Sequence, residues 1–351
     1  MNDDVSLFRV ITSEGPRLLN PEDGHVLPHE HVIIDMRVYW EGEGAWNELD
    51  ALGRGLTLET QYAHRHLPQG TSRDNLVMSD WFVAAQELRE ARDLGCQLVV
   101  DLTTHGLDPQ PSVAMRGFRL AGMPAVLSVG RYLGHAFGEE QSRLSADELA
   151  CGWLDEARQG IDGFAVGMIG EIGTSAVISE IEESSLRAAA SVQAETGLPM
   201  NIHVDPFGRQ GHRVLDILES EGAAIDKVAL SHCDGDIDIE FLASLAERGA
   251  YVEFDLFGTN PEWKIMGRGF NSDDERIVAI TRLVELGHAE RLLMSHDICM
   301  KNSLFSNGGW GFGHLGRSIL PRLDELVGQD MRVLLSATNP LRHLTTDFEA
   351  N

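Results

Sequence analysis

Three apolar runs at a regular spacing decide the fold: FAVGMIGEIG (164–173), PMNIHV (199–204) and VALSHC (228–233). Helical patterns fill the gaps near 178–196 and 211–221. The runs are mostly continuously apolar rather than alternating, which is typical of strands buried on both faces of a parallel sheet. The stretch therefore predicts consecutive strand–helix units.

The same rhythm extends in both directions along the 351-residue chain. Eight such units suggest an α/β fold closed into a (β/α)8 TIM barrel. The rival is an open doubly wound sheet, but no G-x-G-x-x-G motif follows any strand. We expect one domain, 1–351, with a long loop insertion near 38–75 after strand 1, at the mouth of the active site. The other expected strands are 25–35, 97–104, 124–130, 250–257 and 291–298, and the other helices lie near 79–94, 111–121, 145–159, 238–248, 273–287 and 314–327.

The composition argues against several classes of protein. Hydrophobic residues make up 43% and charged residues 24%, which is a globular balance. A formal net charge of −27 disfavours binding to nucleic acid or to anionic membranes. No window of 18 apolar residues could span a bilayer, and the N-terminus MNDDVSLFRV does not resemble a secretory signal. Four scattered cysteines without a C-x-x-C pair favour a reduced, cytoplasmic protein.

Two histidines two residues apart, His29 and His31, close the first expected strand. Side chains at i and i+2 of a strand point to the same face, so both imidazoles can enter the barrel mouth and reach one metal ion. His64 and His66 have the same spacing, but they lie in a polar segment where no strand orients them. We therefore expect metal at the first pair and not at the second.

Four more residues with metal-binding side chains each close an apolar strand. They are separated by 32, 29 and 65 residues, which correspond to one, one and two strand–helix units. Barrel enzymes carry their chemistry at the C-terminal ends of strands. Together with the histidine pair, these residues predict a site for zinc, with manganese or cobalt as alternatives. The four residues are Glu171, His203, His232 and Asp297.

Six ligands exceed what one catalytic zinc ion needs, so the simplest interpretation is two divalent ions. His29, His31 and Asp297 would hold one ion, His203 and His232 the other, and Glu171 would bridge them. Two ions about 3.5–4 Å apart can deprotonate a shared water and polarise a carbonyl or phosphoryl oxygen. Asp297 could take the proton as the bridging hydroxide attacks.

Four residues in the loops after the strands are candidates for contact with a small-molecule substrate. Basic side chains at the rim of so acidic a chain could bind a carboxylate, a phosphate or a sulfonate. The alternative is that they are solvated surface charges. The four are Lys301, Arg209, Arg131 and Tyr132.

Other residues near the mouth leave two interpretations open. Asp234, two residues after His232, is a candidate hydrogen-bond partner for a ligand histidine. Glu253 and Asp255 either border the pocket or pair with neighbours inside the barrel. Trp310, in a glycine-rich run, belongs either to a mobile lid or to a tight turn that buries it.

Several motifs resemble those of the amidohydrolase superfamily and, within it, the phosphotriesterase family. GPRLLNPEDGHVLPHEHV (15–32) resembles the family's first strand and its HxH signature. IHVD (202–205), LSHCDGD (230–236) and LMSHDI (293–298) resemble its motifs on strands 5, 6 and 8. NGGWGFGHL (307–315) and ATNPLRHL (337–344) resemble its C-terminal segment, so the likeness extends over nearly the whole chain.

The resemblance implies a binuclear barrel hydrolase that acts on esters, lactones, amides or organophosphates. True phosphotriesterases place a carboxylated lysine at the end of strand 4, whereas GEIGTS (170–175) places Glu171 there. In this the chain is most similar to the phosphotriesterase-related and phosphotriesterase homology proteins, which are linked to hydrolysis of N-acyl amino-sulfonates and lactones. We therefore expect weak or absent organophosphate turnover. Family members are often dimers, which suits a homodimer here.

Two other functions fit the same residues. A metal-dependent lyase or isomerase would use Asp297 to abstract a proton from carbon. A small-molecule-binding barrel would keep the ligands and lose turnover. The intact Asp297 favours an enzyme over a receptor, because a retired enzyme has no reason to keep its base.

Overall fold

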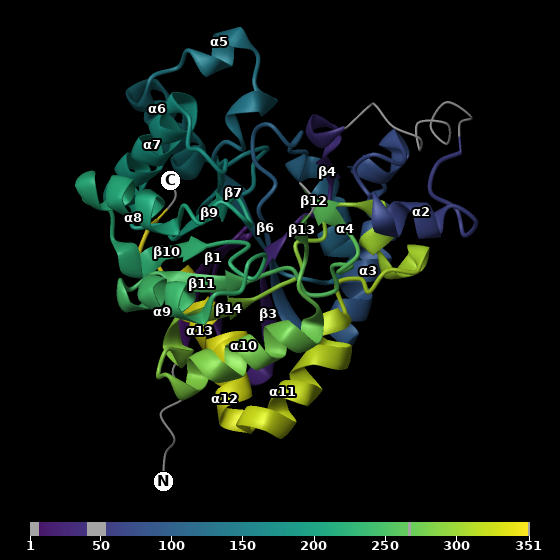
Figure 1. Cartoon of the computed structure of the whole chain (residues 1–351). Coiled ribbons are helices and arrows are strands. Elements are labelled where there is room, and N and C mark those ends of the chain that lie inside the picture. The colour runs from purple at the N-terminus through teal and green to yellow at the C-terminus, as the bar shows by residue number, and fades with distance from the viewer. Residues whose placement is uncertain (1–6, 41–53, 266–267, 350–351) are drawn as a thin grey trace.

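The computed structural model describes residues 7–40, 54–265 and 268–349. Eight parallel strands form its central sheet, in the order β3-β6-β7-β8-β9-β10-β11-β14 (Figure 1). The first and last strands of the sheet meet where Asp297 N–H donates to the His29 carbonyl (3.3 Å) and His29 N–H donates to Ser295 Oγ (3.2 Å). The expected (β/α)8 barrel is confirmed. The strands are β3 His25–Glu30, β6 Cys96–Asp101, β7 Ala125–Val129, β8 Val166–Thr174, β9 Met200–Val204, β10 Val228–Leu230, β11 Tyr251–Phe254 and β14 Leu292–Met294.

Helices surround the strands and begin where the sequence supplies a cap (Figure 1). Ser145, Ser179 and Ser272 each form a capping box with a glutamate three residues later, which satisfies free N–H groups of the first turn. The helix expected near 314–327 begins as a π-helix, Leu315–Ile319. The other helices are α3 Trp81–Asp93, α4 Pro111–Ala121, α5 Glu139–Ser142, α6 Ala146–Gln159, α7 Glu180–Thr196, α8 Gly211–Ser220, α9 Ile239–Glu247, α10 Asp273–Glu285, α11 Leu320–Val327 and α12 Gln329–Val333.

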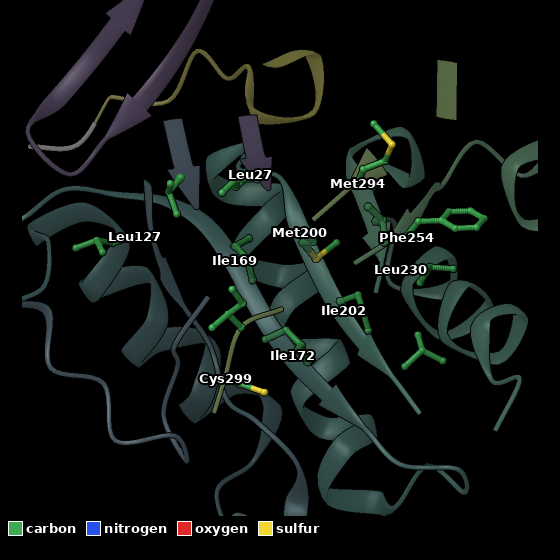
Figure 2. Close-up of a cluster of buried hydrophobic side chains, with 14 of the residues drawn as sticks. Leu27, Leu127, Ile169, Ile172, Met200, Ile202, Leu230, Phe254, Met294 and Cys299 are labelled. Carbon is green, nitrogen blue, oxygen red and sulfur yellow. The ribbon is translucent and has the colours of Figure 1, made fainter. Parts of the chain in front are cut away.

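The strands are buried on both faces, as their apolar sequences predicted. Along β7, Leu127 belongs to the large hydrophobic cluster beneath the helices, whereas its neighbour Val126 belongs to a second, smaller cluster. Figure 2 shows part of the large cluster, with Ile169, Ile202 and Leu230 side chains contributed by successive strands. This double burial makes the barrel wall a rigid support for whatever projects from the strand ends.

Elements from both chain ends meet at the N-terminal end of the barrel. The hairpin of β1 (Phe8–Thr12) and β2 (Gly15–Leu19) contributes Val10 to the smaller cluster. Helix α13 (Asn339–Leu344) contributes Leu341 and Leu344 to the same cluster. These elements do not cover the opposite end of the barrel, where the strands finish.

The segment near 38–75 is not the plain loop that its polar sequence suggested. Residues 41–53 of this prediction lie outside the described residues. The remainder contains α2 (Gln61–His66) and two short 3-10 helices, Arg37–Tyr39 and Arg73–Leu76. His64 is fully buried, with its ring nitrogens bonded to the Thr60 carbonyl and to Ser72 Oγ. Polar side chains that bond to each other let this segment fold with few apolar residues.

Two short pairs of strands lie outside the barrel sheet. β4 (Ile34–Asp35) pairs with β5 (Val77–Met78), and β12 (Lys264–Ile265) pairs with β13 (Arg268–Gly269). Within the described ranges, no helix combines the length and the apolar character needed to cross a bilayer.

Two buried histidines of this scaffold are expected to make it acid-sensitive. Burial and the Lys227 charge lower the pKa of His343 to about 3, and burial with the His296 charge lowers the pKa of His25 to about 4. In the unfolded chain both groups titrate near pH 6.5, so below that pH the unfolded state binds more protons than the folded state. The free energy of unfolding should therefore fall as pH decreases from about 6.5 toward 4.

The His343→Gln variant tests this expectation, because glutamine cannot be protonated yet can donate to the Met200 and Lys227 carbonyls that His343 Nε2 contacts. Between pH 7 and pH 5 the variant should lose about 2 kcal/mol less stability than the wild type, as measured by urea unfolding. Equal losses in the two proteins would show that His343 does not titrate as its burial implies.

Candidate metal centre

Six side chains converge at the C-terminal end of the barrel, on the strands where the sequence predicted them. Glu171 lies within β8 and His203 within β9, whereas His31, His232 and Asp297 follow the ends of their strands. His232 (φ 57°) and Asp297 (φ 50°) adopt the left-handed backbone conformation. This conformation is uncommon outside glycine and is concentrated at functional sites.

The imidazoles form two groups. In the first group, Asp297 Oδ1 lies 3.2 Å from His31 Nε2 and 3.7 Å from His29 Nε2. In the second group, His203 Nδ1 lies 2.9 Å from His232 Nε2. The two-ion interpretation of the sequence, which stays a prediction, divides these residues in the same way.

Glu171 stands between the two groups. Its Oε1 lies 2.8 Å from His203 Nδ1 and 3.1 Å from His232 Nε2, in the second group. The same oxygen is 3.6 Å from His29 Nε2, and Oε2 is 3.7 Å from His31 Nε2, in the first group. One carboxylate thus faces ring nitrogens of four histidines, which come from three strands.

The donor set fits divalent cations. His29 Nε2 is buried and has no hydrogen-bond partner among the described residues. His203 Nδ1 and His232 Nε2 face each other and one carboxylate oxygen, so their lone pairs need a proton or a cation between them. Nitrogen and oxygen donors without a thiolate suit zinc, manganese or cobalt. The combinations His29/His31/Asp297 and His29/Glu171/His232 each bring three donor atoms within 4.8 Å of one another.

The pKa values of the cluster residues show that the site favours positive charge. Burial lowers the pKa of His29, but the Glu171, Asp255 and Glu253 carboxylates outweigh it and raise that pKa well above its ordinary value. Burial raises the pKa of Glu171, but the imidazoles of His203 and His29 hold it well below the ordinary range. Because metal ligands must be deprotonated, loading the site with cations should release protons.

The ring nitrogens of His29, His31 and His232 that face away from the cluster contact residues behind it. His31 Nδ1 contacts Thr103 Oγ1 at 3.0 Å. Asp255 contacts His29 and His232 at 3.0 Å each. Asp234, which the sequence suggested for this role, instead accepts hydrogen bonds from Arg276 and from the Leu256 N–H. The position of Asp255 at the end of the seventh expected strand made it a candidate for this role. The direction of its side chain, toward the pocket or toward neighbours inside the barrel, could not be predicted from the sequence.

Three basic candidates for substrate contact are engaged within the protein. Arg131 is buried, and its guanidinium donates to Ser185 and to the carbonyls of Gln141 and Ile181. Arg209 pairs with Asp236 (2.9 Å) and Asp238 (2.8 Å). Lys301 pairs with Asp74 at 2.5 Å. Each of the three basic side chains therefore has a partner within the protein. These partners could not be predicted from the sequence positions.

Tyr132, the fourth candidate, lies beside the cluster. Its hydroxyl is 3.4 Å from His203 Nδ1 and 2.7 Å from the hydroxyl of Tyr39. Burial raises the pKa of both tyrosines well above the ordinary value, so both phenols stay neutral. Tyr39 could not be identified from the sequence, because it lies in the insertion after strand 1, where no strand periodicity indicates its direction.

Two further residues near the mouth, His105 and Trp310, lie away from the cluster contacts. His105 is exposed and pairs with Glu156 at 2.9 Å. Trp310 is 53% exposed and stacks on His314, with ring centroids 4.5 Å apart. This exposure excludes a turn that buries the indole.

A barrel of eight parallel strands that gathers imidazoles and carboxylates at one rim is of the amidohydrolase type. The chain matches the model of the phosphotriesterase family over residues 12–344. It belongs to that family of hydrolases, which confirms the resemblance of its motifs.

Individual relatives extend over nearly the whole chain. The N-acetyltaurine hydrolase of Danio rerio is 30% identical over 337 residues, which cover 92% of this chain and 94% of the relative. The crystal structure of a resiniferatoxin-binding protein from Rhodobacter sphaeroides matches with a TM-score of 0.90 at 34% identity, over 98% of this chain and 96% of that one. The phosphotriesterase homology protein of Escherichia coli, solved with phosphate in its active site, matches with a TM-score of 0.76 at 25% identity, over 93% and 100% of the chains.

Proposed function

We propose that this chain is a binuclear metal-dependent hydrolase that attacks a carbonyl carbon and cleaves the acyl C–O bond of a lactone or an ester, or the acyl C–N bond of an N-acyl amide. The observation that carries the proposal is the position of Glu171 between the two imidazole groups, with Asp297 beside the first of them. His29, His31 and Asp297 would hold one ion, His203 and His232 the other, and Glu171 would contribute one oxygen to each.

Two bound divalent cations, most simply zinc, would acidify a shared water and polarise the substrate carbonyl. Asp297 is the most exposed of the four carboxylates that contact the imidazoles, with 16% of its side chain accessible against 2% for Glu171 and 0% for Asp255 and Glu253. This position suits it to accept the proton that water loses on attack. The neutral Tyr132 hydroxyl, beside His203, is placed to donate a hydrogen bond to the substrate oxygen.

The substrate class rests on the relatives. The name N-acetyltaurine hydrolase supports an N-acyl amino-sulfonate, and the family supports lactones and esters. With Lys301, Arg209 and Arg131 all engaged, neutral lactones and esters belong in the same assay as anionic amides. Organophosphate turnover should be weak. A small-molecule-binding barrel is the second candidate, favoured by the name of the Rhodobacter relative.

The test combines metal analysis with isotope incorporation. Purified protein should contain about two divalent ions per chain, and hydrolysis in ¹⁸O-labelled water should place one labelled oxygen in the carboxylate product. The assay would offer N-acetyltaurine, a γ-lactone, a neutral ester and a phosphotriester. Two ions without turnover of any of them would favour the binding barrel, and product without labelled oxygen would favour a lyase.

Glu171→Ala should lower the metal content to one ion or fewer and reduce turnover about a hundred-fold or more, because both positions lose a ligand. Glu182→Ala is the matched control, since Glu182 is also a buried glutamate but bonds Ser175 and Ser179 instead of the cluster. If Glu171→Ala kept two ions and full activity, the bridging role assigned to Glu171 would be wrong.

A further inference from the structure

One carboxylate behind the cluster contacts both imidazole groups. Asp255 follows β11 and is fully buried. Its Oδ2 lies 3.0 Å from His29 Nδ1, in the first group, and its Oδ1 lies 3.0 Å from His232 Nδ1, in the second. Apart from Glu171 and Asp297, which face the same imidazoles as candidate ligands, no other described side chain forms a hydrogen bond or an ion pair with both groups.

These contacts decide which nitrogen of each ring is available. An imidazole that donates its Nδ1–H to a carboxylate presents the lone pair of Nε2 on the opposite side. For His29, Nε2 then faces Asp297 and Glu171, and for His232 it faces Glu171 Oε1 at 3.1 Å. Asp255 therefore selects the tautomer and the direction of His232, and its 3.0 Å contact with His29 Nδ1 favours the same tautomer there.

Asp255 also holds the backbone of His232. The main-chain N–H of His232 donates to Oδ1 at 2.9 Å and to Oδ2 at 3.0 Å. His232 has a φ of 57°, a left-handed conformation that a histidine adopts only when its surroundings stabilise it. A shift of the carboxylate would thus move both the ring and the backbone of His232.

The neighbouring carboxylate, Glu253, contacts only one of the two imidazole groups. It lies within β11, its Oε2 is 3.5 Å from His29 Nδ1, and the same oxygen accepts a hydrogen bond from Asn201 at 2.7 Å. Among the described residues, Glu253 forms no hydrogen bond or ion pair with His232. The two acids are equally buried and lie two residues apart, so they form a natural pair for comparison.

We propose that Asp255 is a positioning residue shared by the two metal positions, and that it couples their occupancy. This inference rests on the binuclear site proposed above. Coordination of His29 through Nε2 would fix its Nδ1 against Asp255 Oδ2, which lies 3.0 Å away. The locked carboxylate would then hold His232 in the orientation that the second position needs, so filling one position would favour filling the other.

The test is a zinc titration of the full chain after removal of metal with a chelator, read as ions bound per chain and as steepness of the isotherm. Wild type should bind two ions cooperatively. Asp255→Asn should weaken both binding steps about ten- to a hundred-fold and remove the cooperativity, because its NH₂ group cannot accept from a ring N–H. Glu253→Gln should weaken one step at most and stay cooperative. Circular dichroism of the metal-free proteins checks that each is folded.

Several outcomes would overturn the inference. Wild-type affinity and steepness in Asp255→Asn, weakening of a single step, or equal behaviour of Glu253→Gln would each do so while leaving the proposed function intact. Wild type binding fewer than two ions would instead refute the proposed function and this inference with it. Should Asp255→Asn fail to fold, Asp255→Glu takes its place, because the extra methylene displaces the same charge from both rings, and the same two-step weakening is required of it.

Discussion

Asp297→Asn is expected to reduce turnover by about a hundred- to ten-thousand-fold while most of the metal stays bound. The substitution keeps the shape and one oxygen of the side chain, which lies 3.2 Å from His31 Nε2, but removes its capacity to accept a proton. Asparagine also tolerates the left-handed conformation of this position, φ 50°, so the variant should fold. Elemental analysis and the rate of lactone or amide hydrolysis, measured on one preparation, give the two quantities.

The matched control is Asp108→Asn. Asp108 also has a left-handed backbone (φ 54°), but it is exposed and bonds only Gln110 among the described residues. This variant should keep wild-type activity and metal content. Full activity in Asp297→Asn would remove Asp297 as the base, and loss of both ions would make it chiefly a ligand.

The positions of the ligand candidates could be predicted because strand geometry constrains them. A parallel strand ends at the same rim as its neighbours, so residues that close successive apolar runs must meet. Glu171, His203 and His232 satisfied this rule at a spacing of about one strand–helix unit, and the structure brings them within 3.1 Å of one another. His64 and His66 lacked a strand, and His64 proved to be a buried structural residue.

The partners of loop residues could not be predicted in this way. Lys301 is separated from Asp74 by 227 residues, and Arg131 reaches the carbonyl of Ile181 on a neighbouring helix. Such pairings depend on how loops and helices pack around the barrel, which local sequence does not encode. The same limit explains why Asp234 was assigned to a histidine when its partner is Arg276, 42 residues away.

Arg276→Met is expected to lower the free energy of unfolding by about 3–5 kcal/mol, because it leaves a buried carboxylate without its counter-charge. Arg276 lies in the first turns of α10 and is fully buried. Its Nε contacts Asp234 Oδ2 at 2.5 Å, and one terminal nitrogen donates to the Asn271 carbonyl at 2.6 Å and contacts Asp273 at 3.3 Å.

The loss should affect the metal rim as well as the fold. Asp234 accepts from the N–H of Leu256, which directly follows Asp255, and Asp273 accepts from the Gly258 N–H. Asp273 also contacts His314, beneath the Trp310 ring. Arg276 therefore ties together the loops that follow β10, β11 and β14, and Trp310 fluorescence should change in the variant.

The pH dependence separates this mechanism from a simple packing defect. Burial raises the pKa of Asp234 to about 6 even with Arg276 opposing it, so removal of Arg276 should raise that pKa further. A carboxyl whose pKa is higher in the folded state than in the unfolded state costs stability as pH rises through the folded value. The loss of unfolding free energy in Arg276→Met relative to wild type, measured by urea unfolding, should thus be larger at pH 8 than at pH 5.

The double variant Arg276→Met/Asp234→Asn is the control. It should recover much of the lost unfolding free energy at pH 8, because the uncompensated charge of Asp234 is then gone. A deficit that is independent of pH and unchanged in the double variant would mean that Arg276 stabilises the protein through packing alone.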